Sequence, residues 1–453
     1  MFVTLFIVVA IPITVYLLQA GYRFFAGADG IPASLVVNVA NERPQETDPW
    51  RSLAQGGESN ERMLQNVVSE VKAIRPSYIR LDHMYDFYNV VSRNPDGSLS
   101  FSFTKLDETV LDILAMGAKP FFSLSYMPAA LSKGNELDHP VNWAEWELLV
   151  QKTIEHYSGS VGMNLEGIYY EVWNEPDLFG DYKVYGAKNY LELYRHSALG
   201  AARAQNTRLF KFGGPATTGY YENWMNGLIT FAQENNLWLD FLSWHRYSMD
   251  IDDFEQDALL ANQVAVENGR VEGLELIISE AGHDSKNHAG YDNQFGAIHT
   301  LAISAALADS VTHVFHFEIK DGVGPEKLWG RWGIMTNEKF GTPEKKPRYD
   351  AFSFMNTLTG NQLSVSGDGS WVKAMAYKEG DTVRLMVVNY DQTGKHVETV
   401  PISFENLPFT TFTYTRRDFQ GKSVSKTITA DSPSWQTVEY FAANTAAIIT
   451  LAP

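Results

Sequence analysis

The feature that most constrains the fold is a regular alternation of strand-like and helix-like segments through residues 34–322. The strand-like segments are short and rich in aliphatic and aromatic side chains, and the segments between them have the apolar spacing of amphipathic helices. Eight strands are predicted, at residues 34–41, 78–83, 119–128, 167–177, 208–216, 240–248, 274–285 and 312–322. Apolar strands joined by helices form parallel sheets with both faces covered, and eight such units that close on themselves form a (β/α)8 TIM barrel.

An open, doubly wound sheet is the main alternative architecture. Such a sheet normally has a glycine-rich phosphate-binding turn after its first strand. The glycine-containing segments GGES (56–59), GGPA (213–216) and GVGPEK (322–327) fit neither the dinucleotide-binding nor the P-loop pattern. The pattern therefore favours the α/β barrel.

After about residue 360 the chain changes to short segments in which apolar and polar residues alternate, separated by turns rich in Gly, Asp, Asn and Pro. Segments such as WVKAMAYK and TVRLMVVNY are typical of a C-terminal antiparallel β-sandwich. We predict three parts: a membrane anchor or signal peptide (1–28), a barrel domain (29–360) and a β-sandwich accessory domain (361–453).

The composition excludes several classes of function. The formal net charge of −18 argues against a nucleic-acid partner, because binding to phosphates requires a basic surface that replaces their counterions. The chain has no cysteine, which excludes disulfides, thiol catalysis and zinc–thiolate sites. A neutral or basic polysaccharide is more compatible with this charge.

The first 22 residues have no charged side chain. As a helix they would span roughly 33 Å, enough to cross the hydrocarbon core of a membrane. Ala26-Gly27-Ala28 offers an A-x-A cleavage site, but the apolar stretch is longer than the usual signal-peptide core of about 7–15 residues. We predict an uncleaved transmembrane helix, with a cleaved signal peptide as the alternative. In both cases the rest of the chain is expected outside the cytoplasm, anchored or secreted.

Two predicted strands end in carboxylates. The fourth ends in EVWNEPD, with Asn174 and Glu175 directly before Pro176, and the seventh ends in IISEAGHDS, with Glu280 after buried aliphatic residues. In barrels of this kind the C-terminal ends of the strands meet at one mouth, where the chemistry occurs. A glycosidase needs one carboxylic acid to protonate the leaving oxygen and one carboxylate to attack the anomeric carbon or activate water. The barrel can bring these two glutamates together.

These residues resemble those of glycoside hydrolase family 39, which includes β-xylosidases and α-L-iduronidases and belongs to a clan of retaining (β/α)8 glycosidases. The resemblance extends from about residue 78 to residue 360. It rests on EVWNEPD, on YLELY (190–194) with FKFGGPAT, and on DFLSWHRYS and KPFFSLSYMPAAL, which are similar to the sixth and third strands of the family. It also includes the segment from GIMTNEKF to MNTLTG, which is similar to the passage that joins barrel and sandwich.

The resemblance implies a role for each matching residue. Glu175 would be the general acid/base, Glu280 the nucleophile, and Asn174 a ligand of the sugar 2-hydroxyl. Glu175 would then need a raised pKa, because it must stay protonated until the glycosidic bond breaks. An O-glycosyl hydrolase of this kind requires no cofactor, and its partner is a carbohydrate substrate.

The resemblance also implies residues that surround the two glutamates. Arg80 would hold Glu280 ionised, since a nearby cation lowers the pKa of a carboxylate. His245 and Tyr247 would line the site, with the Tyr247 hydroxyl bonded to the nucleophile. Tyr126, from the third-strand segment, is expected to bind substrate.

Other positions depart from the family pattern. Asp82 occupies the place of a histidine that usually binds sugar hydroxyls, and His83 follows it. Ala281-Gly282-His283 replaces the usual Asn and Tyr after the nucleophile, and Phe315-His316-Phe317-Glu318 stands where a tryptophan is expected. We therefore do not infer a β-xylosidase. Asp82 and His83 are predicted to bind the substrate, and Trp329 and Trp332, which lie in the loop after the eighth strand, are predicted to form walls of its subsites.

Several alternatives remain open. His83, His283 and His316 lack the spacing of a metal hydrolase, so no metal is predicted. The altered positions are also compatible with a catalytically inactive, membrane-tethered glycan-binding protein. A third possibility is an enzyme that cleaves internal bonds of a cell-envelope or exported polysaccharide. The sugar, its linkage and the oligomeric state are not predicted.

Overall fold

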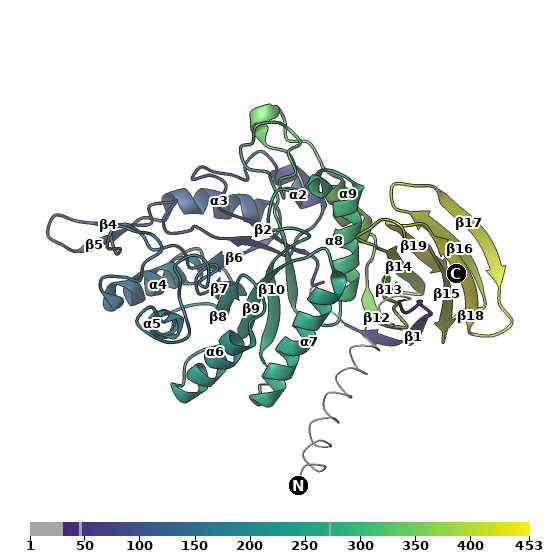
Figure 1. The fold of residues 1–453 in the computed structure, drawn as a ribbon, viewed down its shortest axis with the longest axis horizontal. Coiled ribbons are helices and arrows are strands. Elements are labelled where there is room, and N and C mark those ends of the chain that lie inside the picture. Colours follow the sequence, from purple (N-terminus) through teal and green to yellow (C-terminus); the bar gives the residue numbers. More distant parts are fainter. Residues whose placement is uncertain (1–29, 45–47, 271–272) are drawn as a thin grey trace, which may run out of the picture. The chain divides into compact units, whose positions relative to one another are not determined.

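The computed structural model describes residues 30–44, 48–270 and 273–453 (Figure 1). The described chain forms two compact units, one of residues 48–357 and one of residues 30–44 together with 358–453. Among these residues, no helix has both the length and the apolar character required to cross a membrane. The predicted anchor or signal segment, residues 1–28, lies outside the described part of the chain.

The larger unit is a closed barrel of parallel strands, which confirms the predicted TIM-barrel fold. The strands follow one another around the barrel in chain order, and parallel pairing of the last with the first closes it. They are β2 (Ser52–Gln55), β3 (Tyr78–Leu81), β6 (Lys119–Ser123), β7 (Ile168–Glu171), β8 (Phe210–Thr217), β9 (Phe241–Tyr247), β10 (Glu275–Gly282) and β11 (His313–Phe317).

Helices connect the strands and surround the barrel (Figure 1). Four of them begin at a side chain that accepts a hydrogen bond from the helix's free amides, namely Asn142, Asn189, Asp250 and Asn293. The helices are α2 (Val68–Ala73), α3 (Thr104–Ala115), α4 (Trp143–Tyr157), α5 (Tyr190–Arg203), α6 (Glu222–Glu234), α7 (Ile251–Glu267), α8 (Gln294–Ala306) and α9 (Pro347–Met355). The loops of this unit contain a short hairpin, β4 (Val91–Arg93) with β5 (Leu99–Phe101), and two 3-10 turns, η1 (Ala289–Asp292) and η2 (Glu338–Phe340).

The prediction that residues 34–41 form the first strand of the barrel was wrong. Residues 34–41 form most of β1 (Leu35–Arg43), which belongs to the smaller unit and pairs with strands from the C-terminal part of the chain. The first strand of the barrel is β2, whose four residues are all buried. Side chains in β1 alternate between buried and more exposed positions, as expected for a strand with one face on a core. The barrel domain therefore does not begin at residue 29.

The smaller unit is one mostly antiparallel sheet. Its strands are ordered β17-β16-β19-β14-β13-β12-β1-β15-β18, and only the β1–β15 pair is parallel. Trp435, near one edge of the sheet, packs against Phe412 and Tyr414, near the other, with ring centroids 5.3 and 5.5 Å apart. The sheet therefore folds over one apolar core, as in a sandwich. Its later strands are β12 (Asn361–Ser366), β13 (Val372–Glu379), β14 (Thr382–Asn389), β15 (Glu398–Glu405), β16 (Thr411–Asp418), β17 (Ser423–Thr429), β18 (Trp435–Phe441) and β19 (Thr445–Ala452).

The barrel interior is filled by aromatic side chains near the starts of the strands. Phe121 packs against Tyr169 and Phe315, with ring centroids 5.1 and 4.7 Å apart, and Phe241 completes the cluster. These rings fill the barrel at the end where the strands begin. The open space for a ligand therefore lies toward the C-terminal ends of the strands.

Candidate active site

A cavity of about 540 Å³ opens at the C-terminal ends of the barrel strands. Its volume is within the range of about 300–1,000 Å³ that is usual for small-molecule sites. The polar residues that line it come from the ends of all eight barrel strands or the loops after them, and include Glu58, Asp82, His83, Asn174, Glu175, Tyr247 and Glu280. The predicted convergence of these strand ends is thus present in the structure.

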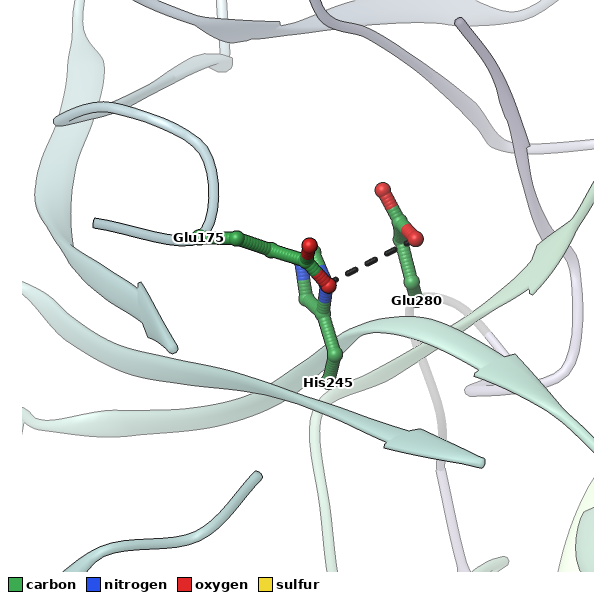
Figure 2. Close-up of side chains that lie close together, drawn as sticks. All are labelled: Glu175, His245 and Glu280. Atoms are coloured by element: carbon green, nitrogen blue, oxygen red, sulfur yellow. Dashed lines mark hydrogen bonds and ion pairs between the residues drawn. The ribbon is translucent and has the colours of Figure 1, made fainter. Parts of the chain in front are cut away.

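Glu175 and Glu280 face each other across this cavity, with His245 between them (Figure 2). One side-chain oxygen of each glutamate and one nitrogen of His245 lie within 4.8 Å of one another. Glu175 follows β7 in the left-handed backbone region, with φ of 46°, and its amide donates to the Ala216 carbonyl at 2.9 Å. This turn and the end of β10 aim the two carboxyl groups at the same point.

Arg80 joins the residues of β3, β7 and β10. Its Nη1 donates to Glu280 Oε1 at 2.9 Å, its Nη2 to Asn174 Oδ1 at 2.7 Å, and its Nε to Glu171 Oε2 at 2.8 Å. The arginine is fully buried, so water does not screen these contacts. Arg80 therefore fixes both Glu280 and Asn174 from beneath the cavity.

His245 and Tyr247 approach the two glutamates from β9. The Nδ1 atom of His245 lies 2.9 Å from Glu175 Oε1 and 3.5 Å from Glu280 Oε2, and the Tyr247 hydroxyl donates to Glu280 Oε2 at 2.8 Å. Burial lowers the pKa of the His245 imidazole, but the neighbouring charges of Glu280 and Glu175 outweigh it and leave that pKa above its ordinary value. A protonated His245 can donate to either carboxylate.

Opposing influences act on the pKa of Glu280. Burial raises the pKa of this carboxyl, the positive charges of His245 and Arg80 lower it, and the negative charge of Glu175 raises it further. The net pKa lies above the ordinary range for glutamate. Arg80 acts in the predicted direction, but its effect does not exceed that of burial.

Asn174 and Tyr126 form a second polar contact at the cavity wall. Asn174 donates through Nδ2 to the Tyr126 hydroxyl at 2.8 Å while its Oδ1 accepts from Arg80. Because one side of the amide is bonded to Arg80 and the other to Tyr126, its orientation is determined by its neighbours. Tyr126 and Asn174 both line the cavity.

Asp82 and His83 follow β3 and also line the cavity. The His83 ring stacks on Phe87, with centroids 4.1 Å apart, and its Nδ1 lies 2.7 Å from Asp86 Oδ2. The Asp86 carboxylate also accepts from the Tyr126 amide, at 3.0 Å. These contacts leave the Nε2 edge of His83 directed away from Asp86.

Comparison with known proteins identifies the family. The sequence profile of glycosyl hydrolases family 39 matches residues 49–297, more than half of the chain. The chain belongs to glycosyl hydrolase family 39.

Individual relatives agree with this assignment. The chain is 25% identical over 358 residues to a β-xylosidase of Caldicellulosiruptor saccharolyticus, covering 73% of this chain and 71% of the relative. The fold is similar to a monomeric β-xylosidase from Caulobacter crescentus, with a TM-score of 0.75, 18% identity and coverage of 93% of this chain and 99% of that one. It is also similar to the bacterial orthologue of human α-L-iduronidase, with a TM-score of 0.67, 15% identity and coverage of 93% and 84%.

Glu175, His245 and Glu280 have the donor types of a metal site, but their contacts do not favour one. Both oxygens of Glu280 already accept hydrogen bonds, one of them from the Arg80 guanidinium, whose charge would repel a metal ion. A histidine that binds metal usually donates its second ring N–H to a partner, and His245 Nε2 has none among the described residues. This family 39 site is better suited to acid–base chemistry.

The long loop after β11 contributes one of the two tryptophans that the sequence predicts as walls of the substrate site. Trp332 lines the cavity, whereas Trp329 is not among the lining residues. The Arg331 guanidinium lies 3.4 Å from the Trp332 ring centroid and donates to the Glu58 carboxylate. Arg331 and Glu58 were not predicted, and their only sequence signal is the density of Trp and Arg in a glycine-rich loop.

The hydrogen bond from Tyr247 to Glu280 can be tested by removing the Tyr247 hydroxyl. In Tyr247→Phe, Glu280 loses a donor that stabilises its ionised form, so its pKa should rise. Because the nucleophile must be ionised, the acid limb of the kcat/KM profile should move to higher pH, and kcat/KM at the optimum should fall by about tenfold. The measurement is a pH–rate profile with an aryl glycoside. Tyr194→Phe, whose hydroxyl donates to the Trp238 carbonyl outside the cavity, is the control. An unchanged acid limb would contradict the assigned contact.

Proposed function

We propose that this protein is a retaining O-glycoside hydrolase that acts by double displacement, with Glu280 as nucleophile and Glu175 as general acid/base. The observation that best supports the proposal is the approach of the two carboxyl groups within 4.8 Å at the barrel mouth. Retaining enzymes have such groups about 5–5.5 Å apart, whereas inverting enzymes leave about 6.5–9.5 Å for a water molecule.

In the first step a Glu280 oxygen attacks the anomeric carbon, the bond to the leaving oxygen breaks, and the Glu175 proton passes to that oxygen. In the second step water attacks the same carbon, its proton passes to Glu175, and the ester bond to Glu280 breaks. Every proton and bond is accounted for by the two glutamates and one water. His245, bonded to Glu175 and close to Glu280, can stabilise whichever carboxylate is charged in each step.

The residues that line the cavity are suited to a substrate that is held by hydrogen bonds and by contact with aromatic rings. Asn174 is positioned beside both glutamates, and Tyr126, Phe317 and Trp332 provide apolar wall. The relatives named as β-xylosidases make aryl β-xylosides the first substrates to try. The arrangement of both carboxyl groups argues against the alternative of a binding protein without turnover.

The stereochemistry of the first product tests the mechanism. We expect the hydrolysed sugar to appear first in the same anomeric configuration as the substrate, because two inversions occur at one carbon. Proton NMR of the anomeric signals during the first minutes of hydrolysis distinguishes this result from inversion. If the opposite anomer accumulates first, the double-displacement assignment is wrong even though the protein is a glycosidase.

We also propose that the protein acts outside the cytoplasm, anchored to a membrane or secreted. The support is the uncharged apolar stretch of residues 1–22. Fractionation of cells that produce the tagged full chain tests this proposal. Activity confined to the cytosolic fraction would contradict it.

A further inference from the structure

Asp82 is a buried carboxylate that faces the candidate substrate cavity. Its side chain is 7% exposed and lines the cavity at the end of β3. Oδ1 has no hydrogen-bond partner among the described residues. A buried charged oxygen without a donor is costly, and Oδ1 is enclosed beside Gly56, so a hydrogen bond from a molecule in the cavity to the open side of this carboxylate would offset part of that cost.

The chain makes room for this carboxylate with a glycine. A Cβ atom at Gly56, in the loop after β2, would lie 1.7 Å from Asp82 Oδ1 and 2.8 Å from Oδ2. Any other residue at this position would force the carboxylate to move. The orientation of Asp82 therefore depends on the absence of a side chain at position 56.

The positive groups whose charges act on Asp82 are Arg80, His83 and His245, and each is already bound to other acids, His245 to Glu175. Arg80 contacts Glu171 and Glu280, and His83 contacts Asp86. Burial raises the pKa of Asp82, and the charges of His83 and Arg80 only oppose this effect. Asp82 is thus a hydrogen-bond acceptor in a region without a free cation among the described residues.

Arginine and lysine side chains also line the cavity, at its mouth. Arg246 is bound to Asp257 and Arg331 to Glu58, which leaves Lys286 as an exposed positive side chain at the rim. Lys286 is the feature that would favour an acidic substrate. It lies at the open edge, where water screens its charge, whereas Asp82 lies in the buried wall.

We propose that Asp82 selects neutral sugars by accepting hydrogen bonds from ring hydroxyl groups in the cavity and by repelling the carboxylate of a uronic acid. Asp82 is then a specificity-determining residue for the glycosidase reaction, and the substrate class is a neutral glycoside. This inference rests on the proposed function only for its kinetic readout, because selection between neutral and acidic sugars can also be measured as binding.

The kinetic test compares aryl glycosides in matched pairs that differ only in CH2OH or COO⁻ at C5, such as glucosides and glucuronides of both anomers, with xylosides as the neutral pentose. The wild-type full chain should prefer the neutral member. Asp82→Asn keeps the size of the side chain and removes its charge, and we expect the neutral-to-acidic ratio of kcat/KM to fall by about 10- to 100-fold.

Two further variants separate position from charge. In Gly56→Ala the new Cβ displaces the Asp82 carboxylate while its charge remains, so the ratio should fall as it does in Asp82→Asn. Lys286→Met should leave the preference for neutral sugars unchanged, because the rim cation does not set it. A wild type that prefers uronides, or a preference that changes only in Lys286→Met, overturns the proposal.

A binding measurement keeps the inference distinct from the proposed reaction. Calorimetry with free xylose and free glucuronic acid should show tighter binding of the neutral sugar to the wild type and a smaller difference in Asp82→Asn. If the sugars bind with this pattern but no glycoside is cleaved, the proposed reaction is wrong and the inference stands. If glycosides are cleaved, but Asp82→Asn changes neither the neutral-to-acidic ratio of kcat/KM nor the difference in binding between the two sugars, only the inference about Asp82 is wrong.

Discussion

Replacing Glu280 by glutamine should reduce kcat on the order of 10⁵-fold, because an amide cannot form the covalent bond to the anomeric carbon. The substitution preserves the volume of the side chain. Its amide oxygen can still accept one of the two hydrogen bonds that the carboxylate accepts, from Tyr247 at 2.8 Å on Oε2 and from Arg80 at 2.9 Å on Oε1. Arg80 keeps its ion pair with Glu171 in this variant, so the main loss is expected in chemistry, with a smaller loss of stability. Steady-state kinetics with an activated aryl glycoside, together with a thermal melt, measures both.

Glu171→Gln is the matched control for this experiment. Glu171 is fully buried and pairs with the same arginine, but it does not line the cavity. Losing its charge should lower the free energy of unfolding, because Arg80 is left with less compensation in the interior. Activity should fall far less than in Glu280→Gln. If Glu280→Gln keeps more than about one hundredth of wild-type turnover, its assignment as nucleophile fails.

Much of the site could be predicted because barrel geometry converts strand order into spatial position. Asn174 and Glu175 are separated from Glu280 by about one hundred residues of sequence, yet each follows the apolar core of its strand, and strand ends meet at one mouth. The same rule places His245 and Tyr247 on β9 beside them. These positions depend only on the strands, which the periodicity indicates well.

Other features could not be predicted from the sequence, because no regular spacing of apolar residues identifies them. Strand β2 has only four residues, SLAQ, and two of them are polar, so its segment does not read as a buried strand. The more apolar β1 was assigned in its place, although its pairing with β15 joins positions far apart in the chain. Loops present the same difficulty: Trp332 lines the cavity and Trp329 does not, and only the folded loop after β11 distinguishes them.

Replacing Glu175 by alanine should impair the two chemical steps to different extents. Protonation of the leaving group contributes about 10²–10⁴-fold in general acid catalysis, so glycosides with poor leaving groups should lose about this factor. The leaving groups of activated aryl glycosides need little protonation, so the first chemical step should remain fast with these substrates. Their turnover should then be limited by hydrolysis of the Glu280 ester, which lacks its general base. A burst of released phenol before a slow steady state is the expected signature.

Azide separates this role from a structural one. Glu175 lines the cavity, and its side chain is 15% exposed, so its removal leaves a space that a small anion can enter from solvent. Azide needs no general base, and it should restore turnover of the activated substrate in Glu175→Ala, giving a glycosyl azide of retained configuration. Glu175→Gln fills the space and should not respond. If azide has no effect, another group donates the proton, and His245, bonded to Glu175 at 2.9 Å, is the nearest candidate.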